Sequence, residues 1–132
     1  MAISFAFYTD PALTTPVNAA LPFVQSTTPT AVDRVLWFGS RLAGRVARLE
    51  AAPGAGQIVI TPTGPGAGDV RLALTADGLA AATPGAALSL GTEVAGGLAG
   101  AVAVHVRVLD TSGLVGARAF AVGTASLAEY AL

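Results

Sequence analysis

Residues 101–109 read AVAVHVRVL, and this stretch decides the fold class. Valine occupies every second position, at 102, 104, 106 and 108, while Ala103, His105 and Arg107 fill the positions between. Because successive side chains of a β-strand point to opposite faces, this spacing puts four β-branched side chains on one face. We therefore expect a core strand over 101–109, with His105 and Arg107 on its second face.

The four residues Asp110-Thr111-Ser112-Gly113 follow this strand and have the composition of a turn. Short polar side chains bond the local backbone there, and glycine tolerates a positive φ. The sequence thus predicts a hairpin that leads from the 101–109 strand into a second strand around Phe120.

Glycine and proline divide the rest of the chain into short apolar runs, roughly every eight to twelve residues. That rhythm is typical of an all-β sandwich or barrel. A chain of 132 residues fits one domain, so we expect a single sandwich spanning 1–132. Nine strands are expected, enough for two packed sheets. They cover residues 3–8, 21–25, 34–38, 45–50, 57–61, 70–75, 87–90, 101–109 and 117–123.

The segment 40–52 allows two interpretations. Three arginines and several apolar residues recur in it at helical spacing, and the serine at position 40 could cap such a helix. Against this, Gly44 lies in the middle, at a cost of about 1 kcal/mol relative to alanine, and Pro53-Gly54 would end the helix early. We favour a loop followed by a strand over 45–50. Single helical turns are also possible at 80–83 and near Leu127.

The chain is poor in charge. Apolar residues make up 53% of it and charged residues only 11%, and it contains no lysine and no cysteine. A typical soluble domain has about 25% charged residues, so we expect part of this exterior to face other protein. The formal net charge of -1 leaves no basic excess for nucleic acid. Residues 1–10 lack the basic leader of a signal peptide, and no apolar run suits a membrane helix.

His105 is the single histidine and the best candidate for a general base. Asp110 or a serine could partner it, but no triad spacing is recognisable. We favour a histidine on the second face of a strand, half exposed or at an interface. We therefore expect that this protein is not an enzyme.

Metal and phosphate sites are not expected either. The eight acids are scattered singly, and neither a cysteine nor a second histidine is present. Residues 64–69 are rich in glycine but lack the lysine of a phosphate-binding loop. We interpret them as the tip of a hairpin and predict no cofactor.

Four of the seven arginines lie between positions 34 and 48. Guanidinium groups pair well with carboxylates, so these arginines either dock onto an acidic partner or pair with neighbouring acids such as Asp33 and Glu50. Beside them, one of Trp37 and Phe38 should enter the core and the other should face the opposite side. An exposed Trp37 would anchor an interface. The candidate partner contacts are Arg34, Arg41, Arg45, Arg48 and Trp37.

Four groups of residues follow one another along the chain in an order that can be compared with known families. They are Phe7-Tyr8-Thr9-Asp10-Pro11, Val35-Leu36-Trp37-Phe38-Gly39-Ser40, Pro53-Gly54 ahead of Gln57-Ile58-Val59-Ile60, and the stretch from Gly78 through 82–88 and Gly91 to 102–107. This order resembles small virion proteins of tailed bacteriophages and related prophage elements. The resemblance covers most of the chain, is carried by turn and strand patterns, and includes no catalytic motif.

The resemblance implies an Ig-like β-sandwich of about seven to nine short strands that decorates or cements a capsid, or else lies on the tail. We therefore expect a non-enzymatic head decoration protein located in the virion. Its expected partners are other virion proteins, above all the major capsid protein, and further copies of itself. No nucleic acid, membrane or cofactor is expected.

Other functions stay open. One is a tail or baseplate component, including a receptor- or carbohydrate-binding tip that would use Trp37, Tyr8 or Tyr130. An enzyme built on His105 is another. Because 3–8 is an apolar strand near the chain end, it could also pair with the sheet edge of another subunit.

Overall fold

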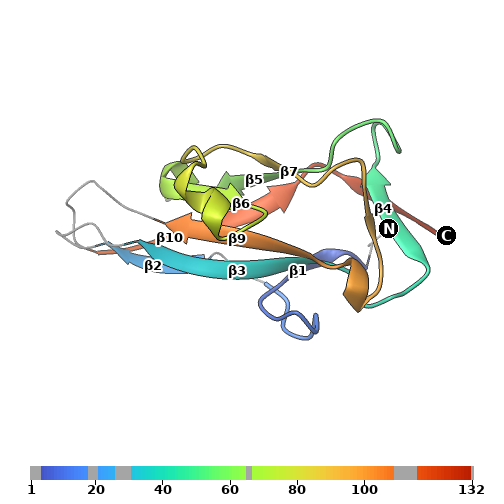
Figure 1. The fold of residues 1–132 in the computed structure, drawn as a ribbon, viewed down its shortest axis with the longest axis horizontal. Helices are drawn as coiled ribbons and strands as arrows, with labels where there is room; N and C mark the ends of the chain where they lie inside the picture. Colours follow the sequence, from blue (N-terminus) through green and yellow to red (C-terminus); the bar gives the residue numbers. More distant parts are fainter. Residues whose placement is uncertain (1–3, 18–20, 26–30, 65–66, 109–115, 132) are drawn as a thin grey trace.

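A computed structural model describes residues 4–17, 21–25, 31–64, 67–108 and 116–131. In these residues the chain forms eleven strands and three short 3₁₀ turns, with no α-helix (Figure 1). The strands are β1 (Ala6–Tyr8), β2 (Leu21–Gln25), β3 (Val32–Gly39), β4 (Arg45–Leu49), β5 (Val59–Thr63), β6 (Val70–Ala73), β7 (Leu88–Ser89), β8 (Glu93–Ala95), β9 (Val102–Val108), β10 (Gly116–Thr124) and β11 (Leu127–Ala131). The turns are η1 (Ala67–Asp69), η2 (Asp77–Ala80) and η3 (Leu98–Gly100).

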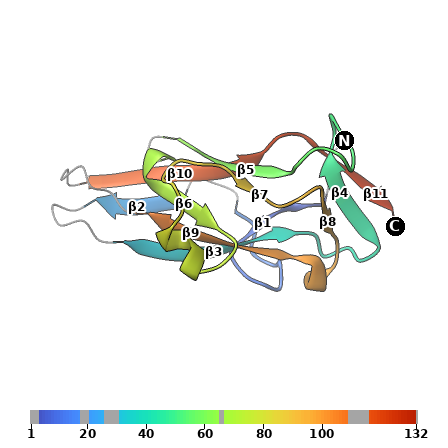
Figure 2. The same ribbon diagram turned by 45° about the horizontal axis from the view of Figure 1, so that its top comes forward.

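The strands form three antiparallel sheets. Sheet 1 has the order β1-β3-β9-β6, sheet 2 has the order β2-β10-β5-β7, and sheet 3 has the order β11-β4-β8. Sheets 1 and 2 share one hydrophobic cluster, and Figure 2 separates the two layers, with β10 and β5 above β9 and β3. The predicted all-β, sandwich-type architecture is confirmed. All nine expected strands are present, several with shifted ends.

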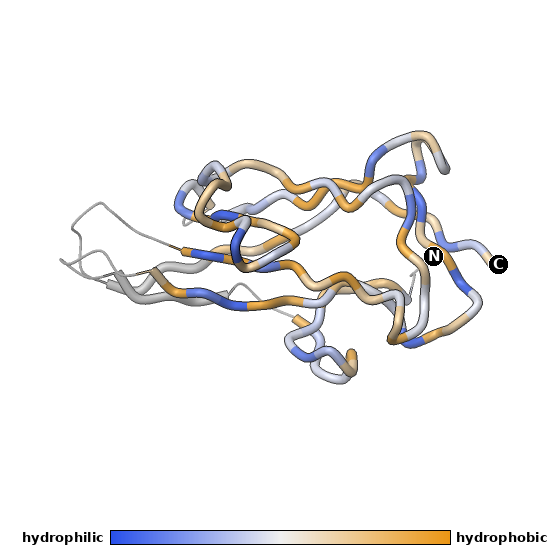
Figure 3. Tube along the Cα trace, viewed as in Figure 1, coloured by the Kyte–Doolittle hydropathy of each residue, from blue (hydrophilic) through white to orange (hydrophobic). Residues whose placement is uncertain are grey.

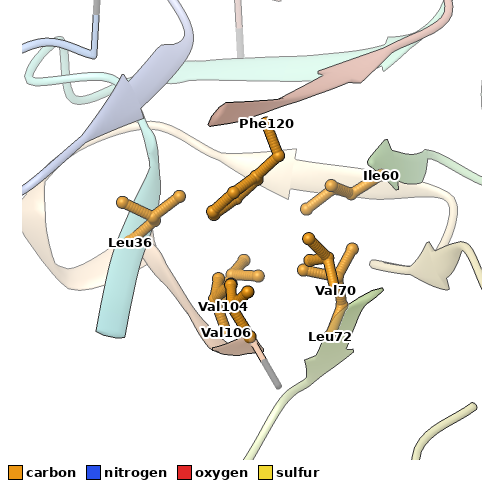
Figure 4. Packing of buried hydrophobic residues seen from close by; sticks show 8 residues of the cluster. Leu36, Ile60, Val70, Leu72, Val104, Val106 and Phe120 are labelled. Carbon is orange, nitrogen blue, oxygen red and sulfur yellow. The ribbon is translucent and has the colours of Figure 1, made fainter. Parts of the chain in front are cut away.

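The main core lies between sheets 1 and 2 and is built on the alternation in β9. Three of the four valines of β9 are buried, while the side chains between them are half-buried, as the spacing predicts. Figure 4 shows the ring of Phe120, from β10, projecting between Leu36 and Ile60 toward Val104 and Val106. Each sheet thus supplies its apolar face to the other.

Sheet 3 closes one end of the sandwich, where β4 lies steeply across the molecule in Figure 1. A second buried cluster joins Phe5 and Phe38 to Ala47 of β4 and Val94 of β8. Phe7 packs against both this cluster and the main core. The third sheet is therefore attached to the sandwich by apolar contact.

The predicted hairpin between 101–109 and the strand around Phe120 is wrong. β9 lies between β3 and β6 in sheet 1, whereas β10 lies between β2 and β5 in sheet 2. The turn 110–113 itself lies outside the described residues. Turn composition indicates only that the chain reverses, and a chain that returns on the other side of the core buries its apolar face equally well.

The segment 64–69 is not the tip of a hairpin either. It leads from β5 in sheet 2 to β6 in sheet 1, and its last three residues form η1. The same physical reason applies, because glycine-rich composition marks a change of direction without choosing the sheet of the next strand.

The segment 40–52 contains a loop followed by a strand, as favoured. β4 begins at Arg45, directly after Gly44, whose φ of 76° lies in the left-handed region that suits glycine. The helical turn considered near Leu127 is wrong, because β11 begins there and pairs with β4. β8 and β11 were not expected, since short alanine-containing strands carry little β-propensity and depend on their neighbours.

Two buried leucines lie outside the sandwich core, on the outer face of sheet 1. Leu79, in η2, is 1% exposed, and η2 contacts both β6 and β9. Leu13, also 1% exposed, reaches Gly39 at the end of β3. Its loop, seen below the sheets in Figure 1, is closed by Asp10, whose carboxylate accepts hydrogen bonds from the backbone of two threonines. The outer face is thus covered in two places.

Candidate interaction surface

Trp37 lies on the outer face of sheet 1. Its register neighbours there are Tyr8 and Ala103, and the tryptophan is half-buried. Phe38 faces inward, is 2% exposed and has its ring centroid 4.9 Å from that of Phe7. This confirms that one ring of the pair enters the core while the other faces away.

The four arginines singled out from the sequence do not form one patch. Arg34 lies in the first half of β3, five positions before Gly39 at the end of that strand. Five positions of extended backbone span roughly 17 Å. Arg41 follows β3, while Arg45 and Arg48 belong to β4 in sheet 3. The structure therefore leaves Arg34 apart from the other three, and Arg45 and Arg48, three residues apart on one strand, face opposite sides of sheet 3.

Two of these arginines are held within sheet 3. Arg45 Nη1 lies 3.2 Å from Glu129 Oε2, and Arg48 Nη2 lies 3.3 Å from Glu93 Oε2. The Arg48 guanidinium also lies 5.5 Å from the ring centroid of Tyr130. These partners are cross-strand neighbours and not the acids that are near in sequence. Both arginines are thus partly engaged within the protein.

A hydrogen-bond network that the sequence did not indicate ties the N-terminal segment to sheet 3. Ser40, fully buried directly after β3, has its Oγ 2.6 Å from Ser4 Oγ. Glu129 Oε1 accepts the backbone N–H of Ser4 at 2.9 Å and also the Ser4 hydroxyl. Ser4 and Glu129 are 125 residues apart, so no local spacing could have revealed the contact.

This network makes stability depend on the charge of Glu129. Hydrogen bonds from the hydroxyl and backbone of Ser4, and the nearby Arg45 charge, hold the pKa of Glu129 below its ordinary value of 4.5. A lowered folded pKa stabilises the protein above the unfolded pKa, and this contribution is lost as the pH falls through the folded value. We expect Glu129→Gln to lower the free energy of unfolding by about 1–2 kcal/mol at neutral pH. Urea unfolding should show this difference shrinking as the pH falls below 4.5 and through the lower pKa that Glu129 has in the folded protein.

Glu93→Gln is the matched control for this prediction. The carboxylate of Glu93 is 51% exposed and pairs with Arg48 at the surface, so its loss should cost less than about 0.5 kcal/mol. Equal losses in the two variants, or a Glu129→Gln effect that persists in acid, would contradict the role of the network.

The loop after β3 and the turn η3 meet at the sheet 3 end of the molecule and expose two leucines. Leu42 is 50% exposed and Leu98 is 54% exposed. The Gly97 N–H donates to the carbonyl of Ser40 at 2.8 Å, and a Cβ on Gly97 would lie 3.5 Å from Ala43 Cα, so the two segments touch. We call the exposed residues here the leucine tip. They are Arg41, Leu42, Ala43, Leu98 and Ala99.

His105 lies half-buried on the outer face of sheet 1, opposite Val35 of β3. A cavity of about 300 Å³ opens beside it. At its rim Asp33 accepts two hydrogen bonds from Arg107, at 2.9 and 3.0 Å, which lower the pKa of the Asp33 carboxyl. The described lining of the cavity includes no serine or threonine, and Asp110 lies outside the described residues. The described lining thus places no hydroxyl nucleophile next to the imidazole.

No cluster of His, Asp and Glu side chains in the described part of the chain could hold a metal ion. None of the described helical segments has the length and apolar character needed to cross a membrane. Comparison of the chain with protein-family models, curated proteins and solved structures finds no match. The fold and its surface define the protein by class, as an all-β, sandwich-type protein with an exposed apolar tip that bears an arginine.

Proposed function

We propose that this chain is a non-enzymatic structural subunit of a bacteriophage-type virion, and that it decorates the head by docking its leucine tip onto neighbouring capsid subunits. The resemblance of its sequence to small virion proteins and its shortage of charge support this role. Docked at a junction, it adds buried area between subunits and so opposes their separation. The major capsid protein is the favoured partner.

The leucine tip carries the proposal. Adjoining exposed apolar side chains indicate an interaction surface more strongly than scattered ones, and interface cores favour apolar residues and arginine over other charges. Arg41 supplies such an arginine beside Leu42 and Leu98, and it has no ion-pair partner among the described residues. Along the trace in Figure 3, strongly hydrophilic residues fall in short, separated stretches. The arginines of the neighbouring strand β4, Arg45 and Arg48, are already paired with Glu129 and Glu93.

Substituting Asp into the tip should weaken docking. We expect Leu42→Asp and Leu98→Asp each to reduce binding to purified heads that lack this protein by at least about tenfold, since a buried charge at the contact costs more than 1.4 kcal/mol. Co-sedimentation of the variants with the heads, followed by quantification of the bound protein, measures the effect.

Leu74→Asp is the matched control, because Leu74 is 49% exposed but lies between β6 and η2, away from the tip. It should bind as the unmodified protein does. If all three variants bind equally well, the tip is not the docking surface. If the unmodified protein does not bind the heads, the head decoration role itself is wrong.

A tail or baseplate role is the second candidate, and the placement of two aromatic residues favours it. Tyr8 and Trp37 are cross-strand neighbours on the outer face of sheet 1, and adjacent rings suit stacking on a sugar or on a partner side chain. Tyr130 lies apart, in sheet 3. Labelling the protein in an image of the intact particle distinguishes head from tail.

A further inference from the structure

A strip of sheet 1 lies on its outer face between the two places where that face is covered. Leu79 of η2 covers the face on one side, and the loop of Leu13 covers it on the other, at Gly39. Four half-buried side chains form this outer strip: Val35, Trp37, Ala103 and His105. The strip and both of its walls lie within residues 4–17, 31–64 and 67–108, which the structure describes.

The cavity of about 300 Å³ lies at one end of the outer strip. Val35 and His105 belong to both, and Ala76 and Leu79 form the wall on the η2 side. The imidazole of His105 makes no hydrogen bond within the described part of the chain, although a neutral imidazole carries one donor and one acceptor nitrogen. A ligand in the cavity can therefore use both.

The ion pair at the rim of the cavity adds fixed polar groups. Arg107 donates from Nε and Nη2 to the two carboxylate oxygens of Asp33, at 2.9 and 3.0 Å. A carboxylate and a guanidinium each have capacity for further hydrogen bonds. Arg34 also lines the cavity, but it alternates with Asp33 and Val35 along β3 and so directs its side chain to the other face. Because the two rim charges balance, the rim favours a neutral ligand with several hydroxyl groups over an anion.

Trp37 extends this site along the sheet. It lies diagonal to His105, because Val35 pairs with His105 and Trp37 with Ala103, and residues in this relation are about 7–8 Å apart. Tyr8 pairs with Trp37 on the side away from β9. The spacing suits a ligand longer than one sugar ring, since the apolar face of one ring can stack on the indole while the next ring reaches the cavity.

We propose that the outer strip and its cavity bind a neutral oligosaccharide. One sugar ring stacks on Trp37, beside Tyr8, and the next ring enters the cavity, where its hydroxyls exchange hydrogen bonds with His105 and with the pair of Asp33 and Arg107. Stacking supplies affinity, and the fixed polar groups select the pattern of hydroxyls. The site specifies the sugar contact considered for a tail role but does not require that location. It is separate from the leucine tip, so it does not depend on docking to the head.

Titration with neutral trisaccharides tests the site. The probes are cellotriose, chitotriose and maltotriose, and the signal is the fluorescence of Trp37, the single tryptophan. At least one probe should give a saturable change, and no saturable change with any of them would overturn the proposal. A change produced by N-acetyltyrosinamide and by none of the sugars would also overturn it, because the strip would then receive a side chain of a partner protein.

Substitutions at Trp37 test the stacking contact, with binding measured by calorimetry. Trp37→Leu should weaken binding of the best of these sugars by at least about tenfold, whereas Trp37→Phe, which keeps an aromatic ring, should weaken it less. Tyr130→Leu removes a ring from β11 in sheet 3 and is the matched control, which should bind as the unmodified protein does. If Trp37→Leu binds equally well, the sugar does not stack on the indole and the proposal is wrong.

A second pair of variants tests the polar contact. Asp33 and Glu93 are both 51% exposed, and each pairs with an arginine. Asp33→Asn should weaken binding of the sugar by at least about threefold, because hydrogen bonds to a charged group are stronger than neutral ones, and Glu93→Gln should leave it unchanged. Equal binding by the two variants would show that the rim pair does not contact the sugar. Tighter binding of trigalacturonate than of the neutral sugars would show that the ligand is an anion.

Discussion

Phe120→Ala is expected to lower the free energy of unfolding by about 3–5 kcal/mol. The ring of Phe120 has no exposed surface and belongs to the cluster that joins sheets 1 and 2 (Figure 4). Its removal loses apolar burial from both sheets and leaves a cavity between them. Since whole domains are stable by only about 5–15 kcal/mol, the loss should be plain in urea unfolding followed by Trp37 fluorescence.

Ile60→Val serves as the graded comparison for this substitution. It removes one methylene group from the same cluster, where Ile60 is also fully buried, and should cost about 0.5–1.5 kcal/mol. A smaller loss for Phe120→Ala than for Ile60→Val would mean that the two sheets do not share this core.

Leu79→Ala is expected to cost about 2–5 kcal/mol, although the residue lies outside the sandwich. Its side chain is 1% exposed and belongs to η2, which rests on the outer face of sheet 1 against β6 and β9. Ala73, on that face, is itself 6% exposed. Truncating the leucine should therefore uncover part of the sheet as well as lose the leucine's own burial.

Leu74→Ala is the matched control, because Leu74 lies five residues earlier and is 49% exposed. A surface substitution of this kind should change the free energy of unfolding by less than about 0.5 kcal/mol. Similar small effects of Leu79→Ala and Leu74→Ala in urea unfolding would show that η2 does not cover the sheet.

The conformation of most of the chain could be predicted from the sequence. The alternation in 101–109 indicates both the strand and its buried face, since the two-residue period of a strand is a local property of the backbone. Gly44 and Pro53-Gly54 likewise favoured a loop and a strand over a helix in 40–52, and β4 is found there. The pair Trp37 and Phe38 was correctly expected to divide between two faces for the same reason.

The candidate surface could be predicted only in part. Arg41 was singled out, but Leu42 and Leu98 were not, because an exposed leucine looks like a core leucine until the fold is known. Arg45 and Arg48 pair with Glu129 and Glu93 on neighbouring strands of sheet 3. These partners are 84 and 45 residues away in sequence.

By itself the sequence determined that this protein is made of short strands, which side of each long strand is apolar, and that too few charges are present to coat an ordinary surface. Only the tertiary structure decided that β9 and β10 belong to opposite sheets and that Ser4 meets Glu129. The physical reason is the range of the forces involved. Strand conformation follows from neighbouring residues, whereas the choice of partner strand follows from how distant apolar faces pack together.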